Sequence, residues 1–152
     1  MDCVVSGNIE SVLQSEGRYI STTKGVSMLP MIKTGRDVII VEPKNGRLKK
    51  YDVALYRRGE AYVLHRVIEV TDDGYIIRGD NTYADEVIPE ADVFGVLTEY
   101  YRGKKLIPVT DEKYLKYVEK RVKSYPERRK RYLFKRKIKN FIKKLIGRRQ
   151  EQ

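Results

Sequence analysis

Six short runs of β-branched and aromatic residues, each closed by turn-forming residues, fill the middle of this chain. Runs of this length and spacing are typical of strands. Two of the breaks, Arg58-Gly59 and Asp72-Asp73-Gly74, contain residues that tolerate positive φ and so favour hairpins. The pattern predicts a compact, mostly antiparallel β-domain. The runs are Val38–Val41, Val53–Tyr56, Tyr62–Val70, Tyr75–Arg78, Val93–Thr98 and Lys105–Val109.

The strand pattern stops after Thr110, and apolar residues then recur at steps of three and four, as one face of a helix requires. Pro126 is expected to interrupt this helix, and Gly147 is expected to end a second one. The sequence therefore predicts a helical tail with an apolar stripe among basic residues. In the second helix the stripe consists of Phe134, Ile138, Phe141, Ile142, Leu145 and Ile146, and the basic residues include Lys135, Arg136, Lys139, Lys143 and Lys144.

Basic charge is concentrated in this tail. The chain has 152 residues, and its 32 Lys and Arg against 21 Asp and Glu give a net charge of +11. Residues 111–152 contain 17 of the basic and 5 of the acidic residues, a balance of +12, which leaves −1 for the rest. A chain of this length fits one domain with an appendage. We divide it into an N-terminal segment with a short helix that ends before Gly17 (1–24), a β-rich domain (25–110) and a basic amphipathic helical tail (111–152).

The remaining composition narrows the class of protein. No stretch approaches the roughly 18 consecutive apolar residues needed to cross a bilayer, and Met1–Gly7 lacks the basic-then-apolar order of a secretory signal. The single cysteine, Cys3, cannot form an internal disulfide, which favours a reducing compartment. One histidine gives poor support for a zinc site, and we expect neither a metal nor a cofactor. The expected location is cytoplasmic.

Three segments carry side chains suited to catalysis. Ser27 lies in Gly25-Val26-Ser27-Met28-Leu29-Pro30, His65 lies inside the longest run, and Asp80, Asp85 and Glu86 lie in the loop after the fourth run. Taken singly, each has a simple structural explanation: a turn serine, a histidine buried beside valines, and an Asx-type loop. Function therefore depends on the three segments considered together.

The linked motifs resemble those of the signal peptidase I and LexA-type serine peptidases. The four motifs occur in that family's order and approximate spacing, and the resemblance covers about residues 25–109. They are Ser27-Met28-Leu29-Pro30, Gly35-Arg36-Asp37, His65-Arg66-Val67 and Gly79-Asp80-Asn81.

The resemblance implies that Ser27 is the nucleophile and His65 the general base. Bacterial members of the family have a lysine at the base position on the long strand, whereas archaeal and endoplasmic-reticulum signal peptidases have histidine, which this chain resembles. Physical chemistry supports the pairing, because a neutral imidazole can accept a serine proton near neutral pH.

An acid is expected to orient His65 and to stabilise its charged form. In the endoplasmic-reticulum type, the functional acid lies five or six residues beyond the Asp of Gly-Asp-Asn. That spacing implies Asp85 or Glu86 here, while Asp80 would help to hold the site together. A gap-free match puts the family's usual aspartate at Glu86, so the sequence leaves the two acids as alternatives.

Two further features depart from the family pattern. Signal peptidases usually have a serine two residues before the nucleophile, and this chain has Gly25 there. Any oxyanion hole is therefore expected to rely mainly on backbone N–H groups, including that of Ser27. We also expect no N-terminal membrane anchor of the signal peptidase kind, so the substrate need not be a secreted precursor at the outer membrane face.

We favour a serine endopeptidase that cleaves a signal peptide, or the leader of a peptide processed in the cytoplasm. The resemblance implies small P1 and P3 side chains on an extended substrate that adds as a strand to an exposed sheet edge. The alternative is a non-catalytic β-module whose basic tail binds nucleic acid or an anionic membrane. A self-cleaving, LexA-like repressor is less attractive, because the region before Ser27 is too short for a helix-turn-helix domain and a cleavable linker.

The tail is expected to place the protein on an anionic membrane surface. Its apolar stripe and its basic residues together suit a helix that lies at such a surface. Nucleic acid ranks second as a partner, because aromatic residues such as Tyr132 and Phe134 more often pack a helix than stack on bases.

Overall fold

The computed structural model describes residues 1–5 and 7–150, with only the backbone described for 148–150. The chain divides into two units, Met1–Leu115 and Lys116–Gln152. Antiparallel strands build most of the first unit, and helices build the second. The chain is thus mainly β with a helical C-terminal tail, as the sequence predicts.

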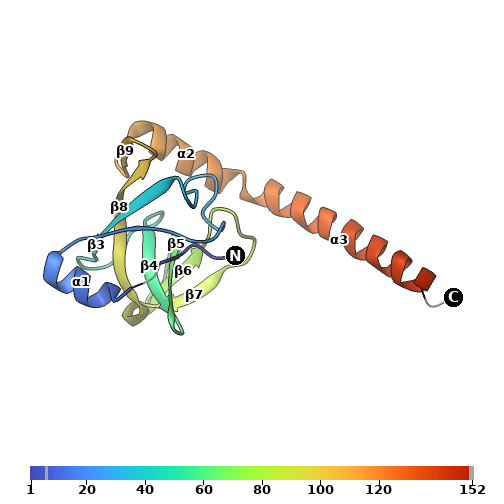
Figure 1. Cartoon of the computed structure of the whole chain (residues 1–152), viewed down its shortest axis with the longest axis horizontal. Helices are drawn as coiled ribbons and strands as arrows, with labels where there is room; N and C mark the ends of the chain where they lie inside the picture. Colours follow the sequence, from blue (N-terminus) through green and yellow to red (C-terminus); the bar gives the residue numbers. More distant parts are fainter. Residues whose placement is uncertain (6, 151–152) are drawn as a thin grey trace. The chain divides into compact units, whose positions relative to one another are not determined.

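One antiparallel sheet contains all nine strands found in the described residues. Its strand order is β2-β3-β8-β4-β5-β6-β7, with β1 paired to β5 and β9 paired to β8. Strands β3 to β9 are labelled in Figure 1. Register shifts interrupt three of the strand pairs, and bulges of this kind bend and twist a sheet. The strands are β1 (Val4–Val5), β2 (Tyr19–Thr22), β3 (Asp37–Pro43), β4 (Val53–Arg58), β5 (Ala61–Val70), β6 (Gly74–Arg78), β7 (Glu86–Pro89), β8 (Val93–Arg102) and β9 (Lys105–Pro108).

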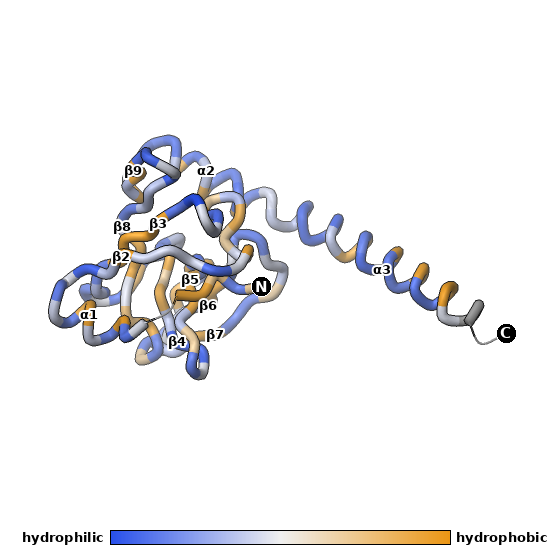
Figure 2. The backbone as a smooth tube through the Cα atoms, viewed as in Figure 1, coloured by the Kyte–Doolittle hydropathy of each residue, from blue (hydrophilic) through white to orange (hydrophobic). Residues whose placement is uncertain are grey.

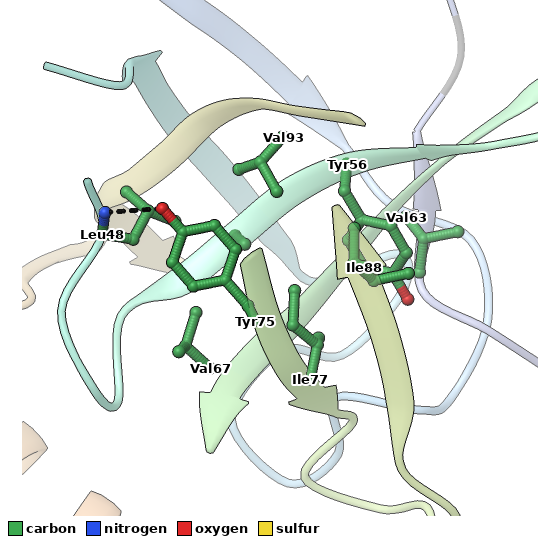
Figure 3. Packing of buried hydrophobic residues seen from close by; sticks show 9 residues of the cluster. Leu48, Tyr56, Val63, Val67, Tyr75, Ile77, Ile88 and Val93 are labelled. Carbon is green, nitrogen blue, oxygen red and sulfur yellow. Dashed lines mark hydrogen bonds between the residues drawn. The ribbon is translucent and has the colours of Figure 1, made fainter. Parts of the chain in front are cut away.

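A cluster of buried apolar side chains from β4, β5 and β6 and their neighbours packs against one face of the sheet (Figure 3). Burial of each large aliphatic or aromatic side chain contributes about 1.5–3 kcal/mol. The hydroxyl of Tyr75 is also satisfied, since it accepts the backbone N–H of Leu48 at 3.0 Å. The cluster consists of Leu48, Ala54, Tyr56, Val63, Val67, Tyr75, Ile77, Ile88 and Val93.

All six predicted runs form strands, and the short N-terminal helix is α1 (Ile9–Glu16), which ends at Gly17 in the left-handed conformation with φ 65°. Three strands were not predicted: β1, β2 and β7. Two of them, β1 and β2, lie in the segment before residue 25 and join it to the sheet. The short 3₁₀ turn η1 (Glu90–Asp92) connects β7 to β8.

The tail forms two helices, α2 (Glu112–Lys123) and α3 (Tyr125–Gln150). Pro126 is the second residue of α3, a position in the first turn where a missing N–H costs nothing. The prediction that Gly147 ends the second helix is wrong, because α3 continues to Gln150. A glycine inside a helix costs only about 1 kcal/mol relative to alanine, so it weakens a helix without ending it. Within the described residues, no helix is long and apolar enough to span a bilayer.

Candidate active site

Ser27 and His65 lie in direct contact. Ser27 is in the turn that follows β2, and His65 is in the middle of β5. The serine Oγ is 2.9 Å from the imidazole Nε2, and the two residues are only 2% and 1% exposed. The structure thus brings together the two residues for which the sequence suggested a nucleophile and a base.

The other imidazole nitrogen contacts a tyrosine and a carboxylate. Tyr56, on β4, has its Oη 3.0 Å from Nδ1 of His65, and it donates its own proton to Oε1 of Glu86 at 3.0 Å. The same Glu86 oxygen is 3.4 Å from Nδ1. Because the tyrosine proton is directed to Glu86, the tyrosine oxygen accepts the Nδ1–H of the ring. We infer from this hydrogen-bond order that Nε2 is unprotonated and free to accept the proton of Ser27.

Charged groups around this network set the protonation of the histidine. Burial lowers the pKa of His65 below its ordinary value of 6.5. The carboxylates of Glu86 and Asp2 act in the opposite direction, and Arg58, which is paired with both of them, assists burial. The net lowering keeps the imidazole neutral at neutral pH, the form that a general base requires.

Asp80 contacts a buried arginine. Its two carboxylate oxygens accept hydrogen bonds of 2.7 Å from Nε and NH2 of Arg66, and Arg66 is fully buried. Arg66 also donates to the Tyr51 carbonyl at 3.0 Å and to the Tyr114 hydroxyl at 3.2 Å. Burial alone would lower the pKa of Arg66, but the charge of Asp80 raises it and keeps the guanidinium charged. This pair connects β5, the strand that carries His65, to the Gly-Asp-Asn turn.

The Gly79-Asp80-Asn81 turn also holds in place the loop that contains Ser27, residues 25–30, which we call the serine loop. The backbone N–H of Asn81 donates to the carbonyl of Ser27 at 2.7 Å, and its side-chain amide donates to the carbonyl of Val26 at 3.1 Å. A Cβ at Gly79 would lie 2.8 Å from the Ser27 carbonyl oxygen and 3.0 Å from Nε2 of His65. Only glycine allows the Gly79 backbone to approach the Ser27 segment and the His65 side chain this closely.

The two acids that the sequence left as alternatives occupy different environments. Asp85 pairs with Arg78, with Oδ2 and NH2 3.1 Å apart, and its side chain is largely exposed. Glu86 is the acid that the structure brings to His65. Asp37, from the Gly35-Arg36-Asp37 motif, is fully buried and accepts the backbone N–H of Lys33 at 2.8 Å, which closes that turn.

Sequence reasoning missed Asp2, whose Oδ1 lies 3.7 Å from Nε2 of His65, and two residues of β4, Tyr56 and Arg58. The predicted hairpin at Arg58-Gly59 contained the signal that could have found the two residues of β4. Its register pairs Tyr56 with Val63 and Ala54 with His65, so the tyrosine is a diagonal neighbour of the histidine on the same face.

Comparisons of the chain with family models, with curated proteins and with solved structures find no match. Among the residues that the structure describes, no group of three or more His, Cys, Asp or Glu is placed to hold a metal ion. Function is therefore inferred from the geometry of this site and from the resemblance of its motifs.

Proposed function

We propose that the chain is a serine endopeptidase of the signal peptidase I type. The observation that carries the proposal is the 2.9 Å contact between Ser27 Oγ and Nε2 of His65, with the other ring nitrogen held by Tyr56 and Glu86. A nucleophile, a base and groups that orient the base are the parts that covalent hydrolysis by serine requires.

In this reaction, Ser27 Oγ attacks the carbonyl carbon of a peptide bond while its proton passes to Nε2 of His65. The tetrahedral intermediate collapses, and the imidazolium returns the proton to the departing amine, which leaves an ester on Ser27. Water, deprotonated by the same nitrogen, then hydrolyses the ester and restores the serine. The carboxylate of Glu86 stabilises the imidazolium, and Tyr56 fixes the orientation of the ring.

The proposed substrate is an extended peptide, either a signal peptide or the leader of a peptide processed in the cytoplasm. Extended peptides bind such sites by adding a strand to a sheet edge, which supplies backbone hydrogen bonds independent of sequence. The family resemblance implies small side chains at P1 and P3.

The test is covalent labelling of the full chain with a small acylating ester, such as p-nitrophenyl acetate. Mass mapping after a long incubation is expected to find the acyl group on Ser27, and Ser27→Ala protein is expected to lack it. Ser15→Ala, which removes an exposed serine, is the matched control and is expected to label normally. Acetyl groups found on lysines, tyrosines or the N-terminus of the unaltered chain, with none on Ser27, would contradict the proposal.

The tail supports a second proposal about location, that α3 binds an anionic membrane surface. Its stripe side chains are between 44% and 65% exposed, and Figure 2 shows apolar residues recurring between hydrophilic ones toward the C-terminal half of α3. On a helix, residues at steps of three and four share one face, so the stripe forms one apolar surface bordered by lysines such as Lys137 and Lys139. An exposed apolar face with basic borders suits anionic lipid headgroups.

A further inference from the structure

The chain's own N-terminal residues pair with β5 and contact Ser27. Strand β1 pairs with Tyr62 and Val63 of β5, and the carbonyl of Cys3 accepts the N–H of Leu64 at 2.9 Å. On its other side, Val4 exchanges backbone hydrogen bonds of 2.8 and 3.0 Å with Lys24. Residues 1–5 therefore lie between β5, which carries His65, and the segment at Lys24 that leads to Ser27.

This segment also contacts the nucleophile. The backbone N–H of Cys3 donates to Ser27 Oγ at 2.6 Å. An amide hydrogen lies in the plane of its peptide group, so an oxygen that accepts it lies along the N–H bond and near that plane. Attack on a carbonyl carbon comes from above the plane. The segment thus engages the serine hydroxyl without presenting the Asp2–Cys3 bond for attack.

An acidic side chain fixes the same segment over the base. The carboxylate of Asp2 pairs with Arg58, and its Oδ1 is 3.7 Å from Nε2 of His65. Gly25 makes this close packing possible, because a Cβ there would lie 1.8 Å from the carbonyl oxygen of Asp2. The glycine that departs from the family pattern is thus the residue against which the segment packs.

We propose that residues 1–5 form an internal plug that blocks the active site until a peptide displaces it. The proposal rests on the proposed peptidase function, since the plug and the substrate compete for the same strand edge and the same serine. A site that is open only part of the time has its apparent affinity and labelling rate reduced by the open fraction. The rate of Ser27 acylation then depends on the open fraction as well as on the chemical step.

The experiment compares the acylation rates of full-length variants at pH 8. The pKa of His65 is lowered, and Asp2 acts only to raise it, so His65 is neutral at this pH with or without Asp2. Asp2→Ala removes the pair with Arg58, and Val4→Pro removes the N–H that donates to Lys24. Each is expected to increase the rate of Ser27 acylation by p-nitrophenyl acetate by about tenfold, the effect of one partly buried hydrogen bond or ion pair. Glu10→Ala is the control, because it removes contacts to Arg57 and Tyr62 on the neighbouring hairpin, and its rate is expected to stay unchanged.

A second measurement reports the plug independently of catalysis. Cys3, the single cysteine of the chain, is 1% exposed, and burial raises the pKa of its thiol to about 11. Its reaction with 5,5′-dithiobis(2-nitrobenzoic acid) is therefore expected to be slow in the unaltered chain and in Glu10→Ala, and faster in Asp2→Ala and Val4→Pro.

The two measurements separate the two proposals. Faster Cys3 reaction with no acylation of Ser27 in any variant would overturn the peptidase function and the plug together with it. Faster Cys3 reaction with an unchanged, measurable acylation rate would overturn the plug alone. Unchanged Cys3 reaction even in the double variant Asp2→Ala/Val4→Pro would also overturn the plug, because a plug must open. Circular dichroism is measured first, and rates are compared among variants whose spectra match that of the unaltered chain.

Discussion

Tyr56 lies between His65, the proposed base, and Glu86, the proposed acid, and its hydroxyl contacts both. Tyr56→Phe keeps the ring in the core but removes the acceptor of the Nδ1–H. We expect kcat for a peptide substrate to fall by about 10-fold to 100-fold with little change in KM, because the oriented tautomer is lost and binding is not. Tyr75→Phe, which also removes a buried hydroxyl, is the control and is expected to lower stability without lowering kcat. Equal loss of kcat in both variants would contradict a positioning role.

The two neighbouring acids allow a direct comparison. Glu86→Gln removes the charge that stabilises the imidazolium, and we expect turnover to fall by a factor of up to about 10⁴, as for a triad aspartate. Asp85→Asn removes a charge that pairs with Arg78 on the surface, and we expect near-normal turnover. Steady-state kinetics on one peptide distinguishes the two, and the reverse order of effects would assign the acid to Asp85.

Asp80 is expected to act mainly through stability. Asp80→Asn leaves the guanidinium of Arg66 buried without its counter-charge, and loss of one partner of a buried pair costs about 3–5 kcal/mol. Urea denaturation is expected to show this loss, with a parallel fall in activity as the serine loop loses its support. The double variant Asp80→Leu/Arg66→Met, which removes both charges, is expected to recover much of the stability. An unchanged urea midpoint together with a lower kcat would instead indicate that Asp80 acts in the catalytic step.

The pH dependence of activity follows from the environment of His65. Only the neutral ring accepts the serine proton, so kcat/KM is expected to rise with pH through the pKa of this group in the free enzyme. Burial lowers that pKa, which places the rise below pH 6.5 and leaves activity level between pH 7 and 8. Glu86→Gln removes a charge that favours the imidazolium, so the rise is expected to move to still lower pH. A rise centred above pH 6.5 would contradict the lowered pKa.

At the scale of elements, the tail makes a separate prediction about location. Each Lys or Arg near an anionic leaflet contributes about 1 kcal/mol, a contribution that salt screens, whereas insertion of the stripe adds a contribution that salt does not remove. We expect the full chain to sediment with phosphatidylserine vesicles, and the double variant Phe134→Gln/Phe141→Gln to release at high salt. Tyr132→Gln, an exposed aromatic of the same helix outside the stripe, is the control. Tight binding to DNA without preference for these vesicles would assign the tail to nucleic acid.

Two of the three strands that sequence reasoning missed, β1 and β7, share a physical cause. Strand β1 has two residues, and β7 ends in Pro89 after a loop of acids and turn residues, so neither shows the alternation that marks a half-buried strand. Their positions are fixed by pairing with β5 and β6, which is tertiary information. Strand β5, which carries His65, was predicted because its long run of mostly apolar and β-branched residues identifies a strand without any knowledge of its neighbours.

At the scale of the whole molecule, the sequence indicated which side chains meet but not how they are held. The motifs pointed to Ser27 and His65, and the structure places them in contact. They did not distinguish Glu86 from Asp85, because the fold alone decides that the loop ends at Asp85 and that Glu86 begins β7. They also gave no indication that residues 1–5 return to the same site, since a five-residue segment carries no pattern of its own.

Arg66 joins parts of the chain that are far apart in sequence. It contacts Met31, which lies 35 residues earlier, and the hydroxyl of Tyr114, which lies 48 residues later. β3, which follows the serine loop, likewise pairs with β8. Contacts of such long separation form late, after the intervening chain is available. During synthesis on the ribosome, the nucleophile and the base therefore emerge well before the residues that complete their support, and a nascent chain is expected to gain activity only once Tyr114 has left the exit tunnel.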